Sequence, residues 1–369
     1  MTDRHSFTAI CLCIEAGVPV IWWGAPGIGK STRMTAYGRA TKRQTETVIA
    51  SIHPPEDFSG LPVRDGDRAR YLPPEWAFRL AECTLARRGL LFFDEISTAP
   101  PSIQAALLRV VLERVIGQLT LPQSVSVVAA ANPTEQAAGG WDLSPPLANR
   151  FVHIETSADP GAWVTGMLSG FPDPEPLHLP GAWQASIHTE RAKIAAFIKA
   201  RPQLLLVVPG DAGKASRGWP SPRSWDSLAR IVAAGRAIGA GEDVLLPLSS
   251  GAVGDGAAHE YLVWEKALDL PDPEDLLAHP GKFRLPERGD KAFAILSSVA
   301  AAAVSNLTER RWTAAWAIIE ACCKAGAKDI GARAAIVLAN ERAKVPDYPI
   351  PAKALAELEP ILAASRGKS

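Results

Sequence analysis

A loop near the start of the chain has the residue types and spacing that bind phosphate. The pattern G-x-x-x-x-G-K-[ST] is matched at every fixed position by Gly24, Ala25, Pro26, Gly27, Ile28, Gly29, Lys30 and Ser31. Glycines let backbone amides converge on an anion, and the N-terminus of a following helix adds to the attraction. In such a loop Lys30 contacts the β- and γ-phosphates, and Ser31 offers its hydroxyl to Mg²⁺. We therefore predict a nucleotide site from Gly24 to Thr32.

Two carboxylates further along the chain supply the groups that hydrolysis needs. Asp94 and Glu95 directly follow the apolar run 90–93. A buried strand here would end beside the phosphate loop, because open α/β sheets bind ligands at the carboxyl ends of their strands. Asp94 would then hold the Mg²⁺ shell, and Glu95 would orient and deprotonate the attacking water. The spacing predicts hydrolysis of a nucleoside triphosphate.

Short apolar runs in the first part of the chain predict the elements that position these groups. The runs are rich in β-branched or aromatic residues and alternate with helical patterns, which is typical of strands buried on both faces. We predict strands at 18–23, 47–50, 89–93, 125–130 and 151–155. The expected fold class is α/β, with a parallel sheet covered by helices.

The later part of the chain is predicted to be helical. Four prolines between residues 170 and 180 predict a stiff extended connector. The expected helices are 185–200, 224–238, 260–268, 291–305 and 308–324. We interpret the domains as an α/β core at 1–170, a Pro-rich linker at 171–182, a helical lid at 183–285 and a helical extension at 286–369. The lysine and glycines of residues 210–215 do not fit the phosphate pattern, and we expect a loop there.

Composition argues against several classes of protein. Lys plus Arg number 39 and Asp plus Glu number 39, which weighs against a strongly basic nucleic-acid binder. The five cysteines form no CxxC pair, so neither a zinc site nor a disulfide framework is supported. We expect no signal peptide and no membrane span, and a reduced, cytoplasmic location.

Taken together, these motifs resemble the AAA+ ATPases. The strand at 125–131 ends in Asn132, similar to the sensor-1 residue that contacts the γ-phosphate or the attacking water. Residues 143–151 resemble a stretch that ends in Asp-Arg-Phe, with Asn149 in place of Asp. This resemblance implies that Arg150 reaches the nucleotide of a neighbouring subunit. The motif 221–223 resembles sensor 2 at the head of a lid helix, which implies that Arg223 makes a lid contact.

Two insertions make the chain similar to the MoxR-like group within the helix-2-insert clade. One spans residues 54–74, with a hairpin turn expected at Asp65-Gly66. The other, residues 113–122, matches the presensor-1 hairpin. The first insertion carries three arginines, which either grip a substrate in a pore or form a solvated face: Arg64, Arg68 and Arg70.

The resemblance implies an ATPase that needs ATP and Mg²⁺, assembles as a homo-oligomeric hexameric ring, and remodels or activates a partner protein. It also points to a partner with a von Willebrand A-type domain. Two alternatives stay open. One is a nucleic-acid remodeller, which the zero net charge disfavours. The other is a nucleotide-gated scaffold with little turnover, against which the intact Glu95 argues.

Overall fold

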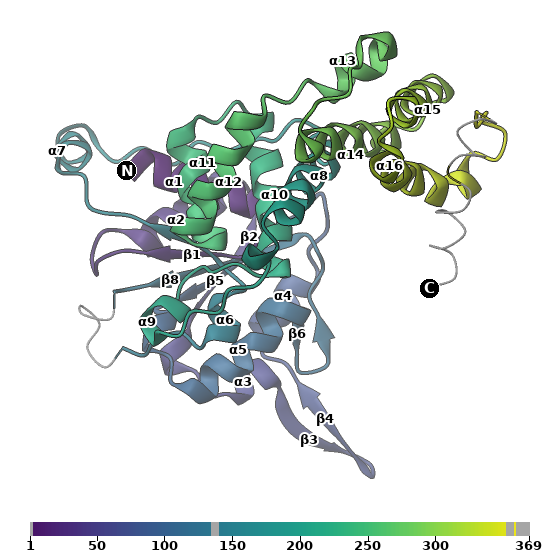
Figure 1. The fold of residues 1–369 in the computed structure, drawn as a ribbon. Helices are drawn as coiled ribbons and strands as arrows, with labels where there is room; N and C mark the ends of the chain where they lie inside the picture. Colours follow the sequence, from purple (N-terminus) through teal and green to yellow (C-terminus); the bar gives the residue numbers. More distant parts are fainter. Residues whose placement is uncertain (1–2, 134–139, 352–357, 359–369) are drawn as a thin grey trace. The chain divides into compact units, whose positions relative to one another are not determined.

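The computed structural model describes residues 3–133, 140–351 and 358. A five-stranded parallel sheet lies in the first part of the chain, in the order β2-β5-β8-β1-β9 (Figure 1). Its strands are β1 (Val20–Trp23), β2 (Gln44–Ile49), β5 (Gly89–Asp94), β8 (Val125–Ala131) and β9 (Val152–Glu155). This sheet confirms the predicted α/β class.

The register of the central strands aligns their carboxyl ends. Trp23 at the end of β1 pairs with Ala131 at the end of β8, and Phe93 of β5 pairs with Ala129 of β8. Every residue of β1 and β8 is buried, as are five of the six residues of β5. Such continuous burial is typical of strands covered by helices on both faces. The residues that follow β1, β5 and β8 therefore lie together at the carboxyl end of the sheet.

Helices and two hairpins complete this region. The helices are α1 (Asp3–Ala16), α2 (Lys30–Ala40), α3 (Glu56–Ser59), α4 (Glu75–Ala81), α5 (Pro101–Glu113) and α6 (Pro145–Ala148). The hairpins are β3 (Leu61–Asp65) with β4 (Arg68–Leu72), and β6 (Val115–Ile116) with β7 (Leu119–Thr120), as the sequence predicts. The hairpins touch at Gly60, where a Cβ atom would lie 2.8 Å from Gly117 Cα. Both glycines also have positive φ, which residues with a side chain rarely adopt. The contact between the hairpins therefore requires glycine at both positions.

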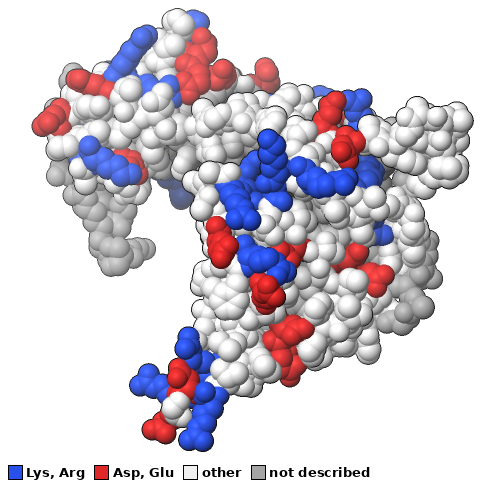
Figure 2. Space-filling view, turned by 180° about the vertical axis from the view of Figure 1, so that it is seen from behind, with Lys and Arg blue, Asp and Glu red and all other residues white. Residues whose placement is uncertain are grey.

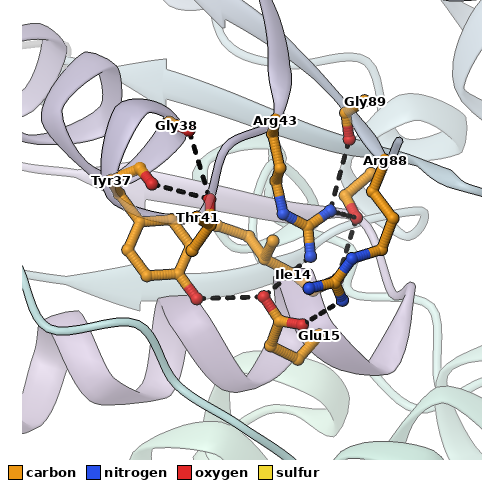
Figure 3. A network of polar contacts seen from close by, with 9 residues as sticks. Ile14, Glu15, Tyr37, Gly38, Thr41, Arg43, Arg88 and Gly89 are labelled. Carbon is orange, nitrogen blue, oxygen red and sulfur yellow. Dashed lines mark hydrogen bonds and ion pairs between the residues drawn. The ribbon is translucent and has the colours of Figure 1, made fainter. Parts of the chain in front are cut away.

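A buried ionic network joins α1 to the amino ends of the strands (Figure 3). The Glu15 carboxylate accepts hydrogen bonds from Arg43 at 2.7 Å, Arg88 at 2.5 Å and the Tyr37 hydroxyl at 3.0 Å. Arg43 also donates to the Gly89 carbonyl at 3.3 Å. Burial raises the pKa of Tyr37 well above its usual range, so the hydroxyl keeps its proton. The network fixes α1 at the end of the sheet opposite the phosphate loop.

The chain divides into two compact units, residues 1–180 with 206–258, and residues 181–205 with 259–369. The first unit adds α7 (Pro160–Ser169), α9 (Ala212–Ala215), α10 (Pro222–Ala237) and α11 (Glu242–Val253) to the sheet. Helix α11 packs against α10 and against β9. Contrary to the loop predicted at 210–215, α9 forms there because the Asp211 side chain accepts a hydrogen bond from the Lys214 amide and caps the turn.

The second unit is helical. It contains α8 (Ala185–Ala200), α13 (Pro273–Ala278), α14 (Gly289–Ser305), α15 (Glu309–Lys324) and α16 (Lys328–Asn340), and α12 (Asp255–Leu268) begins in the first unit and continues here. Short 3₁₀ turns occupy Ala50–Ile52, Ile96–Thr98, Pro202–Leu204, Pro280–Lys282 and Arg342–Lys344. Among the described helices, none combines the length and apolarity that a membrane span needs. The lid at 183–285 and the extension at 286–369 stay predictions.

All five cysteines are buried and none forms a disulfide. They are Cys11, Cys13, Cys83, Cys322 and Cys323. Burial raises the pKa of Cys11 to about 12, and it raises that of Cys322 to about 12 as well. A thiol with so high a pKa stays protonated near neutral pH and reacts slowly.

Candidate functional site

The phosphate loop connects β1 to α2, and its backbone has the shape that its glycines allow. Strand β1 ends at Trp23, and α2 begins at Lys30. Gly27 and Gly29 have φ of 79° and 91°, a region that residues with a side chain rarely adopt. The Gly24 amide donates to the Ala131 carbonyl at 3.2 Å, which joins the start of the loop to the end of β8.

Lys30 lies inside the loop. Its Nζ donates to the carbonyls of Gly24 at 2.7 Å and Ala25 at 3.1 Å, and to Asn132 Oδ1 at 2.8 Å. Burial lowers the pKa of Lys30, while the charges of Asp94 and Glu95 oppose that shift. Neighbouring oxygens therefore hold the ammonium group of Lys30 in the loop. A phosphate would bind this cation more strongly than the carbonyls do.

A hydroxyl and a carboxylate meet beside Lys30. Ser31 Oγ donates to Asp94 Oδ2 at 2.5 Å, and the Glu95 amide donates to Asp94 Oδ1 at 3.0 Å. Hydroxyl and carboxylate oxygens are the hard donors that Mg²⁺ takes, so this pair fits the predicted metal site. Glu95 is exposed and has a left-handed backbone with φ of 54°, and its carbonyl accepts from Thr98 Oγ1 at 2.7 Å.

Asn132 enters the same site from the end of β8. Its amide group accepts from Lys30, and its backbone N–H donates to Ser97 Oγ at 3.1 Å. Ser97 is fully buried, and it links the turn after Glu95 to the turn after β8. Sequence reasoning missed Ser97, because nothing in the pattern around it distinguishes it from a core serine.

These groups surround one cavity of about 290 Å³. Its lining consists of Pro26, Gly27, Gly29, Lys30, Ser31, Thr32, Asp94, Glu95 and Asn132. Among the predicted loop residues, Gly24 and Ala25 contribute carbonyls to Lys30, while Ile28 is part of the loop but not of the lining. The structure thus brings together nearly all of the predicted phosphate, metal and water-activating residues.

The two predicted arginines lie elsewhere and near each other. Arg150 follows α6, and its Nη1 donates to the Pro146 carbonyl. Arg223 is exposed in the first turn of α10. Burial and the charge of Arg223 both lower the pKa of Arg150. Within the described part of the chain, neither arginine lines the cavity that holds Lys30.

One region of the chain is similar to a known protein family. Residues 19–151 match the family model of the AAA domain, dynein-related subfamily. No curated protein matches the chain.

Two solved structures are similar at 14% identity. One, a protein from Cytophaga hutchinsonii that is proposed to be an ATPase, has a TM-score of 0.40, with 77% of this chain and 91% of that chain covered. The other, a full-length MCM homolog from Methanopyrus kandleri, has a TM-score of 0.33, with 71% of this chain covered. The matched part spans 55% of the length of the Methanopyrus protein.

Proposed function

We propose that this chain, whose residues 19–151 match the AAA domain, hydrolyses ATP with Mg²⁺. One observation carries the proposal. Lys30 and Ser31 at the start of α2 meet Asp94 and Glu95 at the end of β5 and Asn132 after β8, and all five line a single cavity of about 290 Å³. Phosphoryl transfer depends on positioning and charge stabilisation, and this set offers a cation, oxygen donors for the metal and an exposed carboxylate.

Each residue has a role that its position supports. When ATP binds, Lys30 exchanges its carbonyl partners for the β- and γ-phosphates. Asn132, which accepts a hydrogen bond from Lys30 in the structure, is released by this exchange and can orient the γ-phosphate or the water. Ser31 and Asp94 would hold Mg²⁺, which neutralises phosphate charge when bound. Glu95, exposed at the cavity, accepts the proton of the attacking water.

The arginines support an assembly of several copies. Arg150 and Arg223 lie outside the lining of their own cavity among the described residues, yet phosphoryl transfer gains from an additional cation. We propose that Arg150 serves the nucleotide of a neighbouring copy in a homo-oligomeric ring, with six copies as the resemblance to MoxR-like proteins suggests. Arg223 would contact phosphate from the start of α10.

We further propose that turnover remodels or activates a partner protein, with a von Willebrand A-type domain as the first candidate. The β3–β4 hairpin is the proposed contact. Its basic residues Arg64, Arg68 and Arg70 are exposed, and Figure 2 shows charged side chains gathered on this hairpin. Arg70 forms an ion pair with Asp65 at 3.5 Å, so the hairpin carries both signs of charge.

The rate of ATP hydrolysis tests the proposal. We expect Lys30→Ala and Glu95→Gln each to lower the turnover rate by about 100-fold or more, because each removes a group that acts on the transferred phosphate or the water. The matched controls Lys324→Ala and Glu82→Gln change exposed residues outside the cavity and should keep the wild-type rate. Equal rates in all five proteins would overturn the proposal. Strong stimulation by DNA that fades steeply with salt would instead favour nucleic-acid remodelling.

A further inference from the structure

Asn149 uses both ends of its side-chain amide on the segment that begins α10. Its Nδ2 donates to the Trp219 carbonyl at 2.8 Å, and its Oδ1 accepts from Ser221 Oγ at 2.6 Å. Ser221 is the N-cap of α10, and its hydroxyl also accepts from the Ser224 amide at 3.1 Å. Asn149 and Ser221 are 6% and 5% exposed, so water cannot replace these bonds cheaply.

The pattern of donors and acceptors requires an amide at position 149. The Trp219 carbonyl offers no proton, and it already accepts from Ser224 Oγ at 3.0 Å. A carboxylate can accept from Ser221 but cannot donate to Trp219, so Asp at this position would set two oxygens against each other in a buried site. This explains in chemical terms why Asn149 suits this chain.

The residue before Asn149 is held by β9. His153 of β9 donates from Nε2 to the Ala148 carbonyl at 2.9 Å and accepts at Nδ1 from Trp23 Nε1 at 2.9 Å. The tryptophan N–H is a donor only, which fixes the neutral tautomer of His153 with its proton on Nε2. The short segment Ala148–Asn149 is therefore linked through His153 to β1, which leads into the phosphate loop, and through the Asn149 side chain to the start of α10.

We propose that Asn149 is a positioning residue that ties the segment carrying Arg150 to the start of the helix carrying Arg223. Arg150 is next to Asn149 in the chain, and Arg223 is two residues after the N-cap serine. A shift of α10 then moves both guanidinium groups together. The inference rests on the proposed function, in which these arginines act on phosphate.

Double-variant kinetics test this inference. We expect Asn149→Ala to lower kcat for ATP hydrolysis by about tenfold, while KM and the affinity for a fluorescent ADP analogue change little, because the nucleotide cavity is untouched. If Asn149 acts through these arginines, Asn149→Ala should lower the residual rate of an Arg150→Ala enzyme by less than the tenfold by which it lowers the rate of the wild type. A general loss of folded protein would instead lower the wild-type rate and the Arg150→Ala rate by the same factor. Thermal unfolding shows whether each variant is folded at the assay temperature.

Further variants keep the result decisive. Asn149→Asp should lower kcat at least as much as Asn149→Ala, and Asn306→Asp, which makes the same change at an exposed helix end, should match the wild type. An Asn149→Ala enzyme with wild-type kcat, beside a slow Arg150→Ala enzyme, would overturn the inference and leave the proposed function intact. An inactive wild type, or a fully active Arg150→Ala enzyme, would overturn the proposed roles and the inference together.

Discussion

His153 shows how a single buried side chain makes the stability of this protein depend on pH. It is 7% exposed, and its imidazole stacks on Trp23 with 6.0 Å between ring centroids. Burial is the main cause that lowers the pKa of His153 to about 3; the bond to the Ala148 carbonyl opposes this shift, and the nearby charge of Arg217 adds to it. The imidazole is therefore neutral in the folded protein at any ordinary pH.

This gives a prediction for acid conditions. An unfolded histidine takes up a proton near pH 6.5, so between about pH 6.5 and pH 3 the unfolded state binds more protons, and the free energy of unfolding falls as the pH falls. From pH 6 to pH 4 we expect His153 to account for a loss of about 2 kcal/mol. Urea unfolding at a series of pH values measures this loss.

The variant His153→Gln is the comparison, because its amide can still accept from Trp23 and donate to Ala148 but does not titrate. Its unfolding free energy should decline less steeply with acid than that of the wild type. Parallel pH profiles for the two proteins would contradict the low pKa of His153.

Residues whose chemistry is local could be found from the sequence, and residues with distant partners could not. Lys30 and Ser31 stand in a fixed pattern that phosphate chemistry dictates. Ser97 bonds a residue 35 positions away, Asn149 one 72 positions away and His153 one 130 positions away. No spacing rule links such pairs, so their bonds become visible only in the folded chain.

At the scale of elements, the network around Glu15 holds α1 against the sheet. The side chains of Glu15 and Arg43 are 4% and 1% exposed, so each charge depends on the other. Removing one partner of a buried pair leaves an uncompensated charge, and this typically costs about 3–5 kcal/mol.

We therefore predict that Glu15→Gln lowers the free energy of unfolding by about 3–5 kcal/mol in chemical denaturation. The matched control is Glu75→Gln, which removes a carboxylate that is 88% exposed and pairs with Arg79. That surface pair should contribute about 0–1 kcal/mol. A loss for Glu15→Gln as small as that of the control would show that water reaches the network.

The elements also show where patterns in the sequence succeed and fail. The buried strands β5 and β8 were predictable to within a residue, because burial on both faces leaves a continuous apolar run. Strand β2 begins at Gln44 rather than residue 47, since it lies at the edge of the sheet and its first residues are polar. Helix α11 escaped prediction because Pro247 lies inside it, and proline normally ends a helix.

At the scale of the whole molecule, the proposed ring divides one reaction between two copies of the chain. The cavity with Lys30 belongs to one copy, and Arg150 would come from the next. A mixture of two inactive variants can then regain activity, because an interface between them joins an intact Lys30 to an intact Arg150.

We predict that Arg150→Ala keeps nucleotide binding but loses turnover, and that mixing it with Lys30→Ala restores part of the rate. With random assembly at equal amounts, about a quarter of the interfaces combine the two intact residues. ATP hydrolysis of the mixture, beside each variant alone, measures the recovery. No recovery in oligomers shown to contain both variants would count against the role of Arg150 in a neighbouring site.

Because every cysteine is buried, a fluorescent dye can be attached at one chosen position to follow a movement of the protein. Maleimide dyes react with accessible thiolates, and all five native thiols are buried. A single Asp67→Cys substitution in the exposed turn of the β3–β4 hairpin would therefore introduce the one thiol that a dye labels rapidly. Fluorescence from that dye could report in real time whether the hairpin moves when ATP is added, without first removing any native cysteine.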